Sequence, residues 1–233
     1  MYFGYMLYTV GYGGFSPEEF LHALRSRGVE VLADVRRFPR SKTGFYYGEN
    51  LREALQRVGV GYVWFGELGA LGVRGPGAGC VASKTFDAYV WRLYHYAPAL
   101  LQLEELEQLA RRRTVALMCR EEDWRHCHRQ FLADFFVQRG FEVIHMRRRG
   151  EERHTPTACF DAYDPPPIDL VKRVYADFSR LCGGASIYLF GGALDGITHD
   201  VDVVAYGVAE DLPEGYDAQA LPKPAEDLFH YFV

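Results

Sequence analysis

The stretch Val115–Arg129, VALMCREEDWRHCHR, predicts a buried strand, a polar loop and the start of a helix in direct succession. The apolar run VALMC has the length of a buried strand, and the following QFLADFFVQRG has the spacing of an amphipathic helix. Cys119 therefore ends the strand, while Cys127 and His128 open the helix. Because open α/β sheets bind ligands outside the carboxyl ends of their strands, beside helix N-termini, we expect a functional site in this loop.

Strands and helices alternate along the chain on both sides of this stretch. Apolar runs predict strands at 5–10, 29–35, 60–65, 114–119 and 141–146. Helices are predicted at 17–27 behind a Ser16–Glu19 capping box, at 51–57, at 84–113 with a break at Pro98, and from Cys127 to Gly140. Residues 147–153 are predicted as an exposed polar turn. We therefore predict an α/β fold, a Rossmann-like and mostly parallel sheet with helices on both faces.

A proline-rich linker, Asp164–Pro167, predicts two domains. Residues 1–163 are expected to form the α/β domain, and residues 164–233 a small α+β domain of one helix and three strands. Through Phe160 the chain has 22 Lys and Arg against 18 Asp and Glu, a net +4. The remainder has 4 against 13, a net −9, and the two values give the overall −5. This asymmetry predicts different surface roles for the two parts.

Composition narrows the class of protein. A hydrophobic content of 48% suffices for a packed core, so general disorder is not expected. The five cysteines are an odd and sparse set and predict no disulfide framework. No apolar run approaches the roughly 20 residues that span a bilayer, and the N-terminal residues lack the basic segment of a signal peptide. We expect a cytoplasmic protein without a membrane partner.

Polar or small residues follow each predicted strand, and parallel strands bring such positions to one edge of the sheet. We predict ligand contacts there from Gly11, Tyr12, Gly13, Asp34, Arg36, Arg37, Glu67 and Arg129. The arginines favour a phosphate-bearing ligand, a nucleotide or nucleic acid. A solvated loop is the alternative for the segment from Asp34 to Arg37.

Cys119, Cys127 and His128 are the predicted catalytic residues. A thiolate at a strand end facing a helix N-terminus is a candidate nucleophile, and His128 a candidate general base. Cys119 and Arg125 have the spacing of phosphatase anion loops, but the acidic residues 121–123 oppose an anion. A zinc site, with His126 or His145 as a further ligand, and a buried core thiol are the two alternatives.

Four segments of the chain resemble, in order, the family called domain of unknown function 488. They are YTVGYGGFSPEEFLHAL, VEVLADVRRFPRS, ELG at 67–69 and ALMCREEDWRHCHRQFLADFF. The resemblance covers about residues 7–145, and its most specific element is Cys-x7-Cys-His-Arg. It marks Gly11, Tyr12, Gly13, Asp34, Arg36, Pro39, Glu67, Cys119, Cys127, His128 and Arg129. Family members usually carry Asp-Pro where this chain has Asp123-Trp124, and the family name implies no reaction.

The C-terminal segment LFGGALDGITHDVDVV resembles the nucleotidyltransferase signature, in which a glycine pair precedes an Asp-x-Asp pair. The resemblance implies that Asp200 and Asp202 hold magnesium, since alternate residues of a strand share one face. Gly192 replaces the usual serine, which weakens the match.

Our prediction is an enzyme that acts on a phosphate-bearing ligand through Cys119, Cys127 and His128. The alternatives are a non-catalytic nucleic-acid-binding module, in which Arg36, Arg37, Arg40 and Tyr46 contact the strand, and metal-dependent nucleotide transfer by the C-terminal domain.

Overall fold

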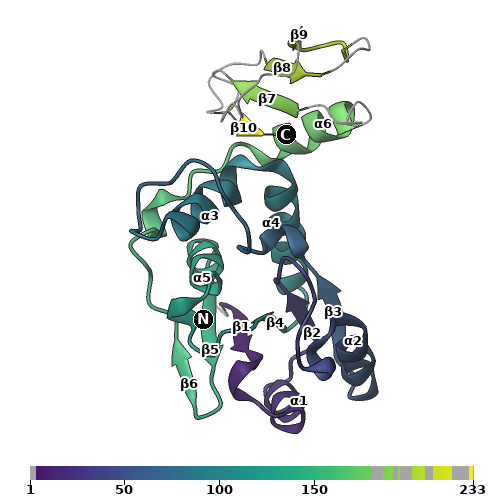
Figure 1. Ribbon diagram of the computed structural model, residues 1–233, viewed down its shortest axis with the longest axis vertical. Helices are drawn as coiled ribbons and strands as arrows, with labels where there is room; N and C mark the ends of the chain where they lie inside the picture. Colours follow the sequence, from purple (N-terminus) through teal and green to yellow (C-terminus); the bar gives the residue numbers. More distant parts are fainter. Residues whose placement is uncertain are drawn as a thin grey trace.

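The main structural unit of the protein is a six-stranded sheet (Figure 1), seen in a computed structural model that describes residues 4–179, 186–190, 194, 201–207, 212–221 and 231–232. Its strand order is β3-β2-β4-β1-β5-β6. The strands are β1 (Tyr5–Gly11), β2 (Val31–Asp34), β3 (Gly61–Trp64), β4 (Val115–Cys119), β5 (Phe141–Met146) and β6 (Glu151–Arg153). All neighbours are parallel except β5 and β6. The predicted α/β class with a mostly parallel sheet is confirmed.

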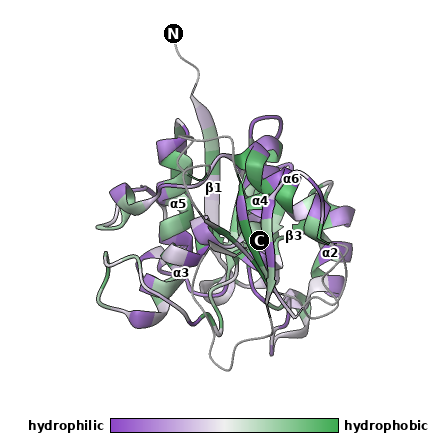
Figure 2. Ribbon diagram, turned by 90° about the horizontal axis from the view of Figure 1, so that it is seen from above, coloured by the Kyte–Doolittle hydropathy of each residue, from purple (hydrophilic) through white to green (hydrophobic). Residues whose placement is uncertain are grey.

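Helices cover both faces of this sheet. They are α1 (Pro17–Ser26), α2 (Gly48–Arg57), α3 (Lys84–His95), α4 (Ala97–Ala110) and α5 (Arg129–Gln138). Apolar side chains of α1 and α2 form one buried cluster with Val10, Leu32 and Met118 of the sheet. Those of α3, α4 and α5 form a second cluster on the other face. Figure 2 marks the hydrophobic residues along these helices in green. Both faces are buried, as the apolar strands require.

Local sequence signals set the helix limits. At the start of α1, Ser16 accepts a hydrogen bond from the Glu19 backbone, and Glu19 accepts one from the Ser16 backbone, which is the predicted capping box. The long helix predicted over 84–113 is divided at Tyr96, because Pro98 fits the first turn of α4 and not a helix interior. Gly140 follows α5 with φ 82°, a conformation that favours glycine.

Two features of the main unit differ from the predictions. Residues 151–153, predicted within a polar turn, form β6 and pair antiparallel with β5. Their charged side chains hid this edge strand, since such a strand needs only backbone hydrogen bonds to its single neighbour. Cys80 and Cys159 form a disulfide, where no disulfide framework was predicted. Their separation of 79 residues gives no local signal of the pairing.

The C-terminal part begins with α6 (Ile168–Phe178) and continues into a second sheet of order β10-β7-β8-β9. Its strands are β7 (Ser186–Phe190), β8 (Asp202–Tyr206), β9 (Asp217–Leu221) and β10 (Tyr231–Phe232). The segment forming β9, parallel to β8, was not predicted as a strand. Figure 1 shows this sheet at the end of the molecule beyond α3 and α4. Within the described parts of the chain, no helix is long and apolar enough to cross a membrane.

Helix α6 packs on both parts of the molecule. Val171 belongs to the core cluster of the main unit, whereas Val174 and Phe178 belong to the core of the second sheet. Lys172 also lies 3.7 Å from the Glu104 carboxylate of α4. The division at residue 164 stays a prediction, and α6 is the element that joins the two sides of that division.

Candidate functional site

The residues at the strand ends separate into two groups, one on each face of the sheet. Met118 packs in the cluster with α1 and α2, while the next residue, Cys119, packs in the cluster with α3, α4 and α5. This follows from the alternation of side chains along a strand. The single pocket predicted at this edge is therefore two sites. We call them the thiol–histidine centre, formed by Cys119, Cys127 and His128, and the basic cavity, defined below.

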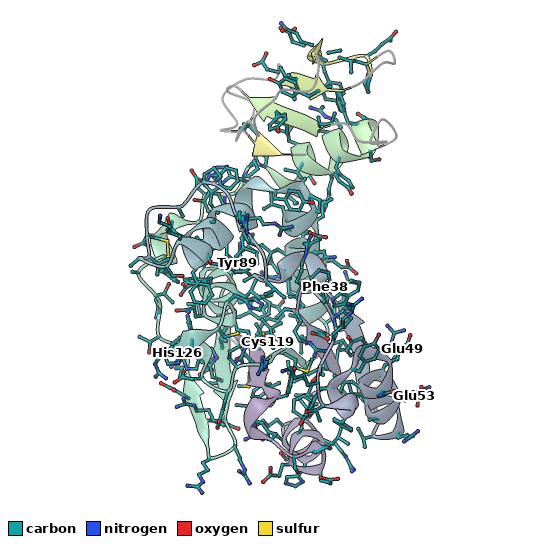
Figure 3. The ribbon with its side chains drawn as sticks, in the orientation of Figure 1. Phe38, Glu49, Glu53, Tyr89, Cys119 and His126 are labelled. Carbon is teal, nitrogen blue, oxygen red and sulfur yellow. A yellow bond between two sulfur atoms is a disulfide. The ribbon has the colours of Figure 1, made fainter. Side chains whose placement is uncertain are left out.

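The thiol–histidine centre is assembled from both ends of the loop between β4 and α5. Its three side chains are 6%, 2% and 6% exposed in chain order, and Figure 3 shows Cys119 in the interior of the main unit, near Tyr89. His128 Nδ1 lies 3.9 Å from the sulfur of Cys119 and 3.7 Å from that of Cys127. All three donor atoms lie within 4.8 Å of one another. The predicted catalytic residues are thus in mutual contact, and their catalytic role stays a prediction.

The two thiols of the centre have opposite tendencies to ionise. The hydrogen bond to Cys127, together with burial, raises the pKa of the Cys119 thiol well above its ordinary value. Burial also raises the pKa of Cys127, but the hydrogen bond from Cys119 and the charge of Arg129 outweigh it and hold that pKa well below the ordinary value. Cys127 is therefore the more acidic thiol of the pair.

Arg129 is the cation of this centre and is 1% exposed. Its Nε donates to the sulfur of Cys127 at 3.3 Å, and its terminal nitrogens donate to the hydroxyl of Thr9 at 3.3 Å and to the carbonyl of Glu121. A buried guanidinium requires a nearby negative charge. The sulfur of Cys127 is the group that this guanidinium contacts, and the charge of Arg129 in turn lowers the pKa of the Cys127 thiol.

A buried hydrogen-bonded chain continues from Thr9 away from the sulfur atoms. Thr9 Oγ1 lies 2.7 Å from His145 Nδ1, His145 Nε2 lies 2.9 Å from His154 Nδ1, and His154 Nε2 lies 2.9 Å from Asp134 Oδ1. With both rings neutral, every donor along the chain has one acceptor. Burial, and the repulsion that protonation of both neighbouring rings would create between His145 and His154, lower the pKa of His145 to about 2. The chain therefore holds Thr9, and through it Arg129, in one orientation.

The glycines of the 11–14 segment allow the cysteine loop to approach β1. A Cβ atom on Gly11 would lie 1.7 Å from the carbonyl oxygen of Glu121, and one on Gly13 would lie 2.8 Å from that of Arg120. The backbone N–H of Gly13 donates to this same Arg120 carbonyl at 2.8 Å. Both glycines were predicted as ligand contacts. Gly11 serves this close backbone packing, whereas Gly13 packs in the same way and also lines the basic cavity.

The basic cavity lies on the other side of this edge and has a volume of about 680 Å³. It is lined by the 3-10 helix Tyr12–Gly14, the start of α1, the loop 40–47 and Arg120; the side chains are those of Tyr12, Phe15, Pro17, Arg40, Ser41, Lys42, Thr43, Tyr46, Tyr47 and Arg120. Within the described ranges, no carboxylate pairs with Arg40, Lys42 or Arg120. The lining thus combines three unpaired cations with hydroxyl groups and aromatic rings.

A buried ion pair holds the loop that lines this cavity. Arg36 donates to both carboxylate oxygens of Asp34, at 2.8 and 2.5 Å, and Tyr62 donates to Asp34 Oδ2 at 2.7 Å. The remaining nitrogen of Arg36 donates to the carbonyls of Tyr46 at 3.0 Å and Arg40 at 3.3 Å. Asp34 and Arg36 were predicted as ligand contacts, and in the structure the carboxylate and the guanidinium group bond to other groups of the protein. The two residues hold the loop 40–47 that lines the basic cavity.

Arg37 and Glu67 are brought together, 2.5 Å apart, in a partly exposed ion pair. Arg92 contacts the same Glu67 oxygen at 2.5 Å. Tyr89, between this segment and the thiol–histidine centre, donates to the Leu68 carbonyl at 2.7 Å, and its ring lies 5.3 Å from that of His128. The ion pairs of Glu67 and the hydrogen bond from Tyr89 to Leu68 hold residues 66–70 beside the thiol–histidine centre.

The predicted metal pair of the C-terminal part is only half described. Asp202 begins β8, with its side chain half-buried, and Asp200 lies outside the described residues. The magnesium site and the nucleotidyltransferase resemblance stay predictions.

Several residues at the two sites were not selected from the sequence. Arg120 could have been predicted, because it follows Cys119 and side chains alternate along a strand. This alternation puts Arg120 on the face opposite to Cys119, where the basic cavity lies. Thr9 interrupts an apolar strand, which is a usable signal of a buried polar contact. Asp134, an acid within the apolar helix segment 131–137, is a signal of the same kind, whereas His154 gave none because it follows a charged edge strand.

Residues 16–136 match the family described as Domain of unknown function DUF488. The match includes α1, β2 and the whole thiol–histidine centre, and it ends before β5 and the C-terminal part. No match to this chain was found among curated proteins or among solved structures. Because the matched range is more than half of the chain, this protein belongs to the DUF488 family of domains of unknown function.

Proposed function

We propose that the basic cavity binds a phosphate-bearing ligand, and specifically a mononucleotide. The observation that carries this proposal is the set of three cations, Arg40, Lys42 and Arg120, in one cavity whose lining has no carboxylate. Cations concentrated in a concave site without compensating acids create a positive potential that attracts anions. Phosphate is an anion that arginine and lysine commonly bind in such sites.

The other lining residues support a nucleotide over inorganic phosphate. Ser41 and Thr43 supply hydroxyl groups, and the rings of Tyr12 and Tyr46 are stacked with centroids 4.2 Å apart. Tyr47 is exposed at the same cavity, where its ring is available to a base. A volume of about 680 Å³ is also within the usual range for small-molecule sites, roughly 300–1,000 Å³.

The proposal concerns binding, because the thiol–histidine centre does not line this cavity. A chemical step at Cys127 would need the ligand to reach the other face of the sheet edge. Binding at the cavity and chemistry at the centre are therefore separate claims with separate experiments.

Calorimetric titration with the four ribonucleoside monophosphates, and with the corresponding nucleosides, tests the proposal. We expect at least one monophosphate to bind and its nucleoside to bind much more weakly, because the cations contact the phosphate. The substitutions R40A and R120A should each lower the affinity about tenfold, the loss of one charge-assisted contact.

Arg112 provides the matched control. It is an exposed arginine following α4, before β4 begins, and so lies at the opposite edge of the sheet. R112A should leave the affinity unchanged. If R112A and R40A lost the same affinity, the binding would depend on the general charge of the protein and not on the cavity. If a short oligothymidylate bound and no monophosphate did, the ligand would be a nucleic-acid strand and not a mononucleotide.

A further inference from the structure

The donor atoms of the thiol–histidine centre have nearly the spacing of a tetrahedral metal site. Zinc bonds of about 2.3 Å to sulfur and about 2.0 Å to nitrogen place tetrahedral sulfur and nitrogen ligands about 3.6 Å apart. The observed distances from His128 Nδ1 to the two sulfur atoms are 3.7 and 3.9 Å. Small side-chain rotations would therefore suffice to place one ion among the three atoms.

The orientation of His128 provides independent support. Its Nε2 lies 2.9 Å from the carbonyl oxygen of Val35, which can only accept, so Nε2 carries the proton. In the neutral ring, Nδ1 then presents its lone pair toward both sulfur atoms. Metal-ligating histidines almost always hold the second nitrogen in this way, on a carbonyl or a carboxylate.

Charge balance identifies a fourth group. An ion of charge +2 with two thiolates is neutral, which would leave the buried Arg129 without a negative partner. One Glu121 carboxylate oxygen lies 3.3 Å from the sulfur of Cys119, and this side chain is exposed and can rotate. With Glu121 as an anionic ligand, the site has a net charge of −1, which Arg129 neutralises.

We infer that Cys119, Cys127 and His128 bind a zinc-class divalent cation, with the carboxylate of Glu121 completing the coordination. Mixed thiolate and imidazole ligands select borderline-soft ions such as Zn²⁺ over Mg²⁺ or Ca²⁺. Arg129 donates to the ligand sulfur of Cys127, and the chain from Thr9 to Asp134 fixes Arg129. This site lies outside the basic cavity and does not depend on the proposed function.

Cobalt substitution tests the inference on the full chain. The reduced protein, freed of metal by a chelator, is titrated with Co²⁺ and then with Zn²⁺. We expect a single cobalt ion per chain with sulfur-to-cobalt charge-transfer absorption, which Zn²⁺ abolishes by displacement. C119S and C127S should each weaken cobalt binding by at least about tenfold, and E121Q by a smaller factor.

The other cysteine pair supplies the matched control. The double variant C80S/C159S removes two thiols away from the centre, one more than C119S or C127S, and should still keep the full charge-transfer band. His126 is an exposed neighbour, and H126A should bind cobalt like the wild type. Because C127S can fail to fold, far-UV circular dichroism of each variant accompanies the titration, and C119S provides the second ligand test.

Two results would overturn the inference. The first is a wild-type protein that develops no charge-transfer band. The second is a band that C80S/C159S removes and C119S retains. Unchanged binding in E121Q would remove Glu121 from the ligand set.

Discussion

The basic cavity and the thiol–histidine centre occupy opposite faces of one sheet edge, and they differ in how their charges are compensated. The cations that line the cavity, Arg40, Lys42 and Arg120, have no carboxylate partner within the described ranges. The buried cation of the centre, Arg129, has its nitrogens on a sulfur, a hydroxyl and a carbonyl of the protein. The positive charges of the cavity are therefore available to a ligand, whereas the guanidinium of Arg129 is already bonded to groups of the protein.

This difference identifies the arginines that are available to bind a ligand. Arg36 and Arg37 follow the same strand as Arg40, yet both are paired with acids of the protein. From the sequence alone, the three arginines are equally good candidates for ligand contacts. Only the contacts separate the arginines that shape a site from those that can meet a ligand.

The largest effect is expected from breaking the ion pair that supports the cavity. Asp34→Asn leaves Arg36 buried without its counter-charge, because Asp34 is completely buried and both of its oxygens contact Arg36. Breaking a buried pair from one side costs about 3–5 kcal/mol, and we expect a loss of this size in urea unfolding.

The control for this change is Glu53→Gln on α2. Glu53 pairs with Arg57 at 3.6 Å, and both side chains are mostly exposed, as Figure 3 shows for Glu53. Such pairs contribute only about 0.3–0.5 kcal/mol. A loss in D34N as small as that in E53Q would contradict the supporting role of Asp34.

A smaller effect is expected in the pH dependence of the free energy of unfolding, through His145 in the buried chain beside the thiol–histidine centre. The pKa of His145 falls to about 2 in the folded protein, because burial and electrostatic repulsion from the neighbouring His154 ring disfavour its protonated form. The unfolded chain binds this proton below its ordinary pKa of about 6.5. The contribution is therefore complete above pH 6.5 and is lost as the pH falls toward 2, by about 1.4 kcal/mol for each pH unit.

The comparison uses H145Q and the exposed residue His22, through H22Q. Unfolding free energies between pH 6.5 and 5 should show a flatter pH slope in H145Q and an unchanged slope in H22Q. The window lies above the titration of most carboxyl groups, so histidines dominate it. An unchanged slope in H145Q would mean that His145 titrates normally and is not part of a neutral buried chain.

Local signals predicted much of the fold. The Ser16–Glu19 capping box, the break at Pro98 and the glycine at 140 each act within a few residues, and the structure confirms all three. Strand alternation with helices also fixed the parallel sheet, since parallel neighbours require long crossovers. The edge strand β6 was missed because its charged residues lack the alternation of a half-buried strand, although Gly150 in the preceding turn, with φ 94°, is a local hairpin signal. The Cys80–Cys159 disulfide joins residues 79 apart, and no local pattern encodes it.

The predicted site residues lie at one edge of the sheet, and the structure distributes them over both of its faces. Cys119, Cys127 and His128 were grouped correctly, because the loop between a strand end and a helix start must bring its two ends together. The single pocket was not correct, because neighbouring residues at a strand end point to opposite faces. One residue of register decides whether a side chain reaches the cavity, as for Arg120, or the centre, as for Cys119.

Amide hydrogen exchange in the presence of the best-binding ribonucleoside monophosphate shows where on the protein the ligand lies. We expect slower exchange in the loop 40–47 and around Gly13 and Arg120, with no change in α5 (Arg129–Gln138). Protection confined to residues 127–138, with none in the loop 40–47, would place the phosphate at the thiol–histidine centre and rule out phosphate binding in the basic cavity.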